Sequence, residues 1–197
     1  MPTPDGLSSV VHNGINSSLS AANLCREHHL VAAVVIIYAT IDAIAGLHAK
    51  GNHREKEFTD WTRENLLGPL GRRDSNLANL GERDIWIARN TVLHSFSSLS
   101  VTTACDSRVA RLYYVSKGDG ESWEEWKPPA LTDGRIVRVC VDDLFEAMRE
   151  AVSSWRAKVV GDPELLRQVN CKGRQFFSET QFQNVYFRDE EPPRTRA

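Results

Sequence analysis

One stretch limits the folds open to this chain more than any other, the apolar run LVAAVVIIYATIDAIAGL at residues 30–47. It is apolar on almost every side, as in a helix that other helices surround or one that crosses a membrane. Its length is at the lower limit for crossing a bilayer, and it contains Asp42, a charge that is costly in lipid. We therefore expect a buried helix over residues 26–48 and no membrane association.

A second long helix is predicted over residues 79–103. Its apolar residues recur at helical spacing and would form one buried stripe, made of Ile85, Val92, Leu93, Phe96 and Leu99. At 100° per residue, Arg89 falls inside this stripe. A buried guanidinium needs a partner, because an unpaired buried charge is expensive.

Asp42 is the one acid of the 26–48 helix after Glu27. It could lie near the helix end, where its carboxylate meets water. It could instead pair with Arg89, since both are charges set in otherwise apolar helix faces. Both interpretations stay open.

The composition is that of a soluble globular protein, with 197 residues of which 41% are hydrophobic and 25% charged. A formal net charge of −2 and a pI near 6.3 supply no overall attraction to phosphate, so any nucleic-acid site would have to be local. The four cysteines are widely spaced and form no C-x-x-C pair, which favours reduced thiols in the cytoplasm.

Several enzyme classes have no support in the sequence. It contains no phosphate-binding P-loop, no dinucleotide fingerprint and no Gly-x-Ser-x-Gly elbow, which argues against an ATPase, a dinucleotide enzyme and a serine hydrolase. Cys25, His28 and His29 share a helix face and could ligate a metal, but no fourth ligand is evident. We therefore expect no metal site and no cofactor.

The sequence predicts a single, mainly α-helical domain over residues 16–187. Residues 1–15 are expected to form a flexible N-terminus, and residues 188–197 (RDEEPPRTRA) a disordered tail. Between the two long helices we expect a peripheral helix over residues 53–67 and a loop over residues 68–75, where Gly and Pro gather.

The periodicity changes after the second long helix. The β-rich runs VARLYYV at residues 109–115 and IVRVCV at residues 136–141 predict a two-stranded β-hairpin over about residues 108–141, with a long connection.

Two further helices should follow. Asp142 or Asp143 would cap a helix over residues 143–160. Pro163 would open a shorter helix that ends near Asn170, because proline is favoured at the first helical position. An aromatic-rich arm would complete the domain.

Arg89, Asn90 and His94 form an Arg-x4-His motif within RNTVLH. In a chain with 18 arginines and six histidines, such a spacing is expected by chance more than once. The context adds weight, because a polar Asn follows the Arg and the Arg lies in the apolar stripe of a long helix. These side chains suit RNA cleavage by the 2′-hydroxyl. Histidine exchanges protons near neutral pH, arginine stabilises charge on phosphate, and Asn90 could bind the phosphate or hold the imidazole.

The motif RNTVLH, the preceding helix with IYATIDAIAGL and the context DIWIARNTVLHSFSS resemble the HEPN superfamily (higher eukaryotes and prokaryotes nucleotide-binding domains), in an uncharacterised branch carried by bacteria and plasmids. The resemblance covers about residues 20–105. It implies an antiparallel helical bundle, to which the hairpin and the C-terminal helices are additions.

The resemblance also implies an activity. Members of the superfamily include metal-independent endoribonucleases that act as toxins or defence effectors, with a site formed across a homodimer. By this resemblance Arg89 and His94 would be catalytic, with RNA as substrate and an antitoxin or defence protein as a possible partner. Other members have lost catalysis and only bind nucleotide or RNA, or serve as interaction modules.

Helix geometry bears on the dimer. Residues five apart on a helix point about 140° away from each other, so Arg89 and His94 of one chain do not face the same way. Two copies related by a two-fold axis could bring both pairs into one cleft. The remaining interpretation is a core-facing Arg with a partner acid and an unrelated surface His.

Overall fold

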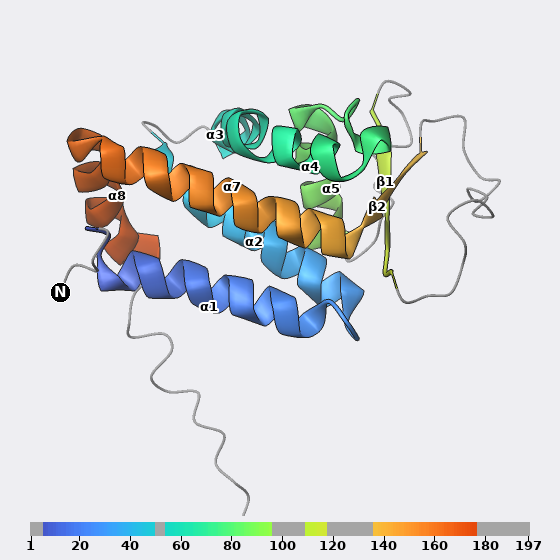
Figure 1. Ribbon diagram of the computed structural model, residues 1–197, viewed down its shortest axis with the longest axis horizontal. Coiled ribbons are helices and arrows are strands. Elements are labelled where there is room, and N and C mark those ends of the chain that lie inside the picture. Colours follow the sequence, from blue (N-terminus) through green and yellow to red (C-terminus); the bar gives the residue numbers. More distant parts are fainter. Residues whose placement is uncertain (1–5, 50–53, 96–108, 118–135, 177–197) are drawn as a thin grey trace, which may run out of the picture.

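The apolar run forms α2 (Leu30–His48), which lies in the middle of a helical bundle (Figure 1). The computed structural model describes residues 6–49, 54–95, 109–117 and 136–176. Within these ranges most of the chain is helical, and it also contains a two-stranded sheet. The predicted mainly α-helical fold class is therefore confirmed.

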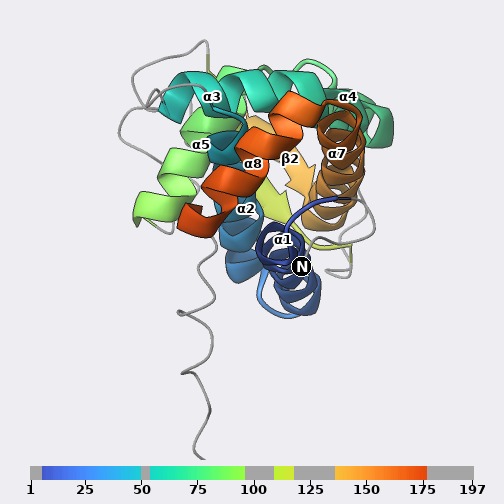
Figure 2. The same cartoon turned by 90° about the vertical axis from the view of Figure 1, so that its left-hand side faces the viewer.

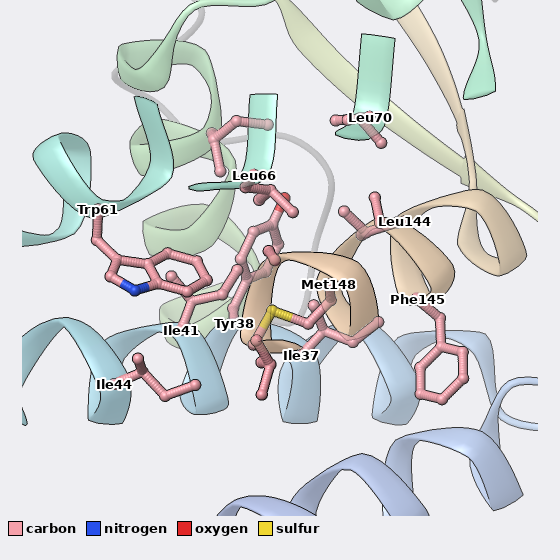
Figure 3. Packing of buried hydrophobic residues seen from close by; sticks show 14 of the residues in the cluster. Ile37, Tyr38, Ile41, Ile44, Trp61, Leu66, Leu70, Leu144, Phe145 and Met148 are labelled. Atoms are coloured by element: carbon pink, nitrogen blue, oxygen red, sulfur yellow. The ribbon is translucent and has the colours of Figure 1, made fainter. Parts of the chain in front are cut away.

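Five helices from different parts of the described chain pack around α2. They are α1 (Ser9–Cys25), α3 (Arg54–Trp61), α5 (Glu82–Ser95), α7 (Val141–Gly161) and α8 (Pro163–Phe176). Figure 3 shows the core that results, in which Ile37, Ile41 and Ile44 of α2 lie in one cluster with side chains of α3, α7 and α4 (Leu67–Arg73). Each of these three isoleucines is at most 1% exposed.

Among the described residues, α2 is the helix that is long and apolar enough to span a membrane, with a mean hydropathy of 2.3. Half of its most apolar window is buried inside the structure. A core helix of a soluble protein has the same composition, because helices cover it on several sides. Packing in the bundle accounts for the buried half of this window.

The N-terminal helix begins earlier than the sequence suggested. α1 starts at Ser9, and the side chain of Ser8 accepts a hydrogen bond from the Val11 amide, as an N-cap does. The prediction of a flexible segment over residues 1–15 is therefore wrong for residues 9–15. Helix formation there buries Val11 and Ile15, which lie one turn apart.

The predicted loop over residues 68–75 is also mostly helical. After α3, a π-helical turn, η1 (Thr62–Leu66), leads directly into α4 (Leu67–Arg73). The N–H that Pro69 lacks would have bonded the carbonyl of Asn65, which lies in η1, where the α-helical pattern is already interrupted. Continuing the helix buries Leu66 and Leu70 completely, and α4 packs against α7. This burial outweighs the weak helix propensity of Gly and Pro.

The two β-rich runs do pair, but not as a hairpin. β1 (Arg111–Val115) and β2 (Ile136–Cys140) run parallel, from the pair Arg111 and Ile136 to the pair Val115 and Cys140. The prediction of an antiparallel hairpin is therefore wrong. Parallel strands need a long crossover, and the 20-residue connection between these strands is long enough for one. Most of that connection lies outside the described residues.

Asp84, in the first turn of α5, joins this sheet to the helices. One of its carboxylate oxygens accepts a hydrogen bond of 2.8 Å from the amide of Ala110, the residue directly before β1. The other accepts the amide of Gly81 at 2.9 Å. A carboxylate that accepts hydrogen bonds from backbone amides at a helix N-terminus also interacts favourably with the helix dipole. Asp84 therefore fixes both the start of α5 and the entry into β1.

α7 follows β2 without a loop, since its N-cap is Cys140. Asp142 and Asp143 were predicted as alternative caps but lie in the first turn, where their charges favour the helix dipole. The apolar side of α7 is buried, from Leu144 and Met148 to Trp155. α8 begins at Pro163 as expected but continues to Phe176. The rest of the aromatic arm and the tail over residues 188–197 lie outside the described residues.

α8 closes one end of the bundle, where it crosses α2 (Figure 2). Gln168 donates to the last carbonyls of α2 at 3.1–3.3 Å, and Lys172 donates to the carbonyls of Gly46 and Ala49. These side chains satisfy carbonyls that a helix C-terminus leaves without partners. The amide side chain of Asn170 also bonds the backbone at both Gly6 and Ser8, which ties the start of the chain to its last described helix.

Candidate functional site

Asp42 of α2 and Arg89 of α5 meet where these two helices pack together. The Nε of Arg89 donates to Oδ2 of Asp42 at 2.7 Å, and Nη2 of Arg89 donates to the same oxygen. The side chains are 13% exposed for Arg89 and 26% exposed for Asp42. Of the two interpretations of Asp42, the structure therefore shows the pairing with Arg89.

The surroundings of Arg89 explain why it needs this partner. Ile85, Ala88 and Val92 of the same helix are each less than 10% exposed, so the guanidinium leaves α5 within a buried stripe. Charged hydrogen bonds are strengthened where water is partly excluded. The ion pair lets a cation occupy a position that an apolar residue would otherwise fill.

Two other side chains of α5 contact the guanidinium. Nη1 of Arg89 donates to Oδ1 of Asn90 at 2.6 Å. The central carbon of the guanidinium also lies over the indole of Trp86, 5.0 Å from the ring centre. Arg89 is thus held by a carboxylate, an amide and an aromatic ring.

Arginine has five N–H groups, of which Asp42 and Asn90 engage three. Each terminal nitrogen carries a second N–H, for which the described residues supply no acceptor. A planar donor pair of this kind can bind two oxygens of a phosphate or carboxylate. The site can therefore present N–H donors to an anionic ligand, on a guanidinium whose charge Asp42 balances.

His94 lies in the last described turn of α5, five residues after Arg89. Its side chain lies outside what the structure describes, and so do residues 96–103 of the predicted long helix. The start of that helix is Glu82 rather than Asn79, and its described part ends at Ser95. The structure thus brings Asp42, Arg89 and Asn90 together, and the position of the His94 imidazole stays a prediction.

A buried tyrosine pair lies one helical turn from Asp42 and was not predicted. The hydroxyls of Tyr38 on α2 and Tyr114 on β1 are 2.5 Å apart, and the rings meet edge to face. Burial raises the pKa of both hydroxyls above the ordinary value for tyrosine. In the sequence Tyr38 is one more large residue of an apolar run, and only the tertiary fold reveals its partner.

The metal alternative is not formed in the described part of the chain. No three His, Cys, Asp or Glu side chains come together there in a set that could hold a metal ion. This applies to Cys25, His28 and His29, which occupy the end of α1 and the turn into α2.

A groove of about 460 Å³ lies between α1 and α7, and none of its lining residues was predicted as a site residue. Its lining mixes apolar and polar side chains: Leu19, Ser20, Asn23, Leu24, Phe145 and Arg149. Leu24 is 77% exposed at its rim. No sequence pattern had indicated this groove.

Comparison of the chain with models of known protein families, with curated proteins and with solved structures found no match. The site must therefore be interpreted from its own residues.

Proposed function

We propose that this protein is a metal-independent endoribonuclease of the HEPN type, active in the cytoplasm at a site formed across a homodimer. The observation that carries the proposal is the fixed guanidinium of Arg89, on a helix that also bears His94. The resemblance of RNTVLH to the HEPN motif and the mainly helical fold are consistent with it.

The proposed chemistry uses the 2′-hydroxyl of RNA as the nucleophile. Histidine can take the proton of this hydroxyl or give one to the leaving 5′-oxygen, because it exchanges protons near neutral pH. The second N–H groups of Arg89 would bind the phosphate oxygens, on which negative charge grows in the transition state. Asp42 would hold Arg89 in place, and Asn90 would fix the outer part of the guanidinium.

The homodimer is part of this proposal. Helix geometry separates Arg89 and His94 of one chain by about 140° around α5. A two-fold axis near this helix would place the Arg89 of one protomer close to the His94 of its partner.

The second candidate is a catalytically inactive HEPN-type module that binds RNA, nucleotide or a protein. The Asp42–Arg89 contact favours it, because two guanidinium donors on one carboxylate oxygen are enough to explain an arginine in an apolar stripe. In that case the ion pair would serve stability, and His94 would have no chemical role.

Cleavage of RNA in the presence of EDTA separates the two candidates. We expect the wild-type protein to cleave, and Arg89→Ala and His94→Ala to lose at least 100-fold in rate, as is typical of the loss of an electrostatic or acid–base group. Arg26→Ala is a matched control, because Arg26 also forms a partly buried ion pair, with Asp142 at 3.1 Å. His48→Ala is the histidine control, at an exposed position of α2.

The endoribonuclease proposal fails if the wild type leaves RNA intact, or if the Arg89 and His94 variants cleave as fast as the two controls. RNA binding without cleavage, at the same affinity in wild type and His94→Ala, would support the inactive module instead.

The toxin or defence role belongs to the same proposal. Expression of the wild type should arrest bacterial growth, and His94→Ala should not. A protein that restores growth when it is expressed together with the wild type would be the antitoxin or defence partner. Growth that is unaffected by the active enzyme would overturn the toxin role.

A further inference from the structure

Trp86 lies between the core and the candidate site. It precedes Arg89 by three residues on α5, so both side chains leave the helix on the same side. Its ring contacts the Arg89 guanidinium, whose central carbon is 5.0 Å from the ring centre. Phe58 of α3 packs against the indole as well, with the ring centres 5.3 Å apart and the planes tilted by 57°.

This arrangement gives the indole a firm support. Phe58 is 1% exposed and belongs to the hydrophobic core, whereas Trp86 is only partly buried. Trp86 therefore reaches from the core to the edge of the site, with a buried ring beside it and a cation over it. A guanidinium over an aromatic face is attracted to it by the charge distribution of the ring.

The contacts of Arg89 restrain it in different directions. The hydrogen bonds to Asp42 and Asn90 lie along N–H bonds, which are in the guanidinium plane. Such bonds resist rotation within that plane but resist displacement perpendicular to it only weakly. A ring that faces the guanidinium limits this second movement. The three contacts together define both the position and the tilt of the donor pair.

We infer that Trp86 is a positioning residue of the ribonuclease site, which orients the Arg89 guanidinium for the phosphate through its aromatic face. This inference rests on the proposed function. Charge stabilisation in a transition state depends on donors that are held close to their productive geometry before the reaction. Loss of the ring should therefore lower kcat more than it raises KM, because a loosely held Arg89 still attracts the phosphate of bound RNA.

The test compares Trp86→Phe, which keeps an aromatic face, with Trp86→Leu, which keeps only apolar bulk. We expect Trp86→Leu to lower kcat about tenfold, which corresponds to about 1.4 kcal/mol in the barrier. KM should change less than threefold, and Trp86→Phe should recover most of the rate. Thermal melting shows which variants are folded, and Trp86→Met replaces the Leu variant if that one does not fold.

Phe145→Leu is the matched control. Phe145 lies under a guanidinium in the same way, with the central carbon of Arg26 4.9 Å from its ring centre, but between α1 and α7. This variant should cleave RNA like the wild type. An equal loss of rate in Phe145→Leu and Trp86→Leu would assign the effect to general destabilisation and overturn the inference.

A second readout does not depend on activity. In a nitrogen–proton NMR spectrum, the Nε–H signal of Arg89 should be shifted by the ring current of Trp86 and protected from exchange by Asp42. Both effects should weaken in Trp86→Leu and persist in Trp86→Phe. An unchanged signal in Trp86→Leu, or full activity of that variant, overturns the inference while the proposed function stands. Absence of cleavage by the wild type overturns the proposed function, and with it the role of Trp86 as a positioning residue.

Discussion

The Asp42–Arg89 ion pair gives a quantitative prediction about stability. Asp42→Asn keeps the shape of the side chain and one acceptor but removes the negative charge. The guanidinium of Arg89, whose side chain is only 13% exposed, would then lack a counter-charge while its hydration stays incomplete. We expect the free energy of unfolding to fall by about 2 kcal/mol, which is typical of a partly buried charge that loses its partner.

The second half of a double-mutant cycle separates this contact from the general effect of mutation. Arg89→Leu restores an apolar stripe on α5, and Asp42, at 26% exposure, can still reach water. We expect a cost of about 1 kcal/mol for this variant and no further cost when Asp42→Asn is added to it. The coupling energy of the pair would then be about 2 kcal/mol.

Urea unfolding, followed by circular dichroism, measures all four proteins of the cycle. The control cycle uses Lys56 and Asp60 on α3, whose charged atoms are 2.6 Å apart but whose lysine is 74% exposed. Exposed pairs are weak, so the coupling there should be much smaller. A coupling for Asp42 and Arg89 that is no larger than that of the control would refute the reasoning from burial.

Three further predictions concern other parts of the bundle. Gly173→Ala should lower the free energy of unfolding by about 1–3 kcal/mol, because a Cβ there overlaps the side chain of Val11. Gly161→Ala should have no such effect, because nothing lies within 4 Å of its Cβ. Thermal melting compares the two variants. Lys172→Met should weaken the end of α2, and amide hydrogen exchange in its last turn should become faster while the middle of α2 keeps its protection. Burial raises the pKa of Tyr38, so above pH 10 the unfolded chain loses this proton first and stability falls as pH rises. Tyr38→Phe should reduce that fall by up to about 1.4 kcal/mol per pH unit in urea titrations, and an unchanged slope would contradict the burial effect.

Periodicity and charge placement predicted the main features of this protein. The apolar run at residues 30–47 was expected to be a helix with neighbours on several sides, and α2 packs against several helices. Arg89 and Asp42 stand out because each is a charge on an apolar face, and a buried charge requires a partner. These inferences succeeded because they depend on local spacing and on a large energetic penalty.

Other features depend on tertiary contacts that local patterns do not contain. The helix through Pro69 forms because it buries Leu70 against α7, and the direction of β1 relative to β2 depends on the path of a long connection. The hydrogen bond between Tyr38 and Tyr114 joins residues 76 apart in the sequence. Sequence patterns indicate which residues are buried in the fold, but not which distant residues they contact.

The contacts of α8 with the start of the chain and with the end of α2 have a consequence for synthesis on the ribosome. Ser8 meets its partner Asn170 only after 162 further residues have been made, and Gly46 at the end of α2 meets Lys172 after 126 further residues. During that time the most apolar helix of the protein lacks part of its cover. The nascent chain should therefore bind chaperones that recognise exposed apolar segments. It should dissociate from them once α8 has left the ribosome.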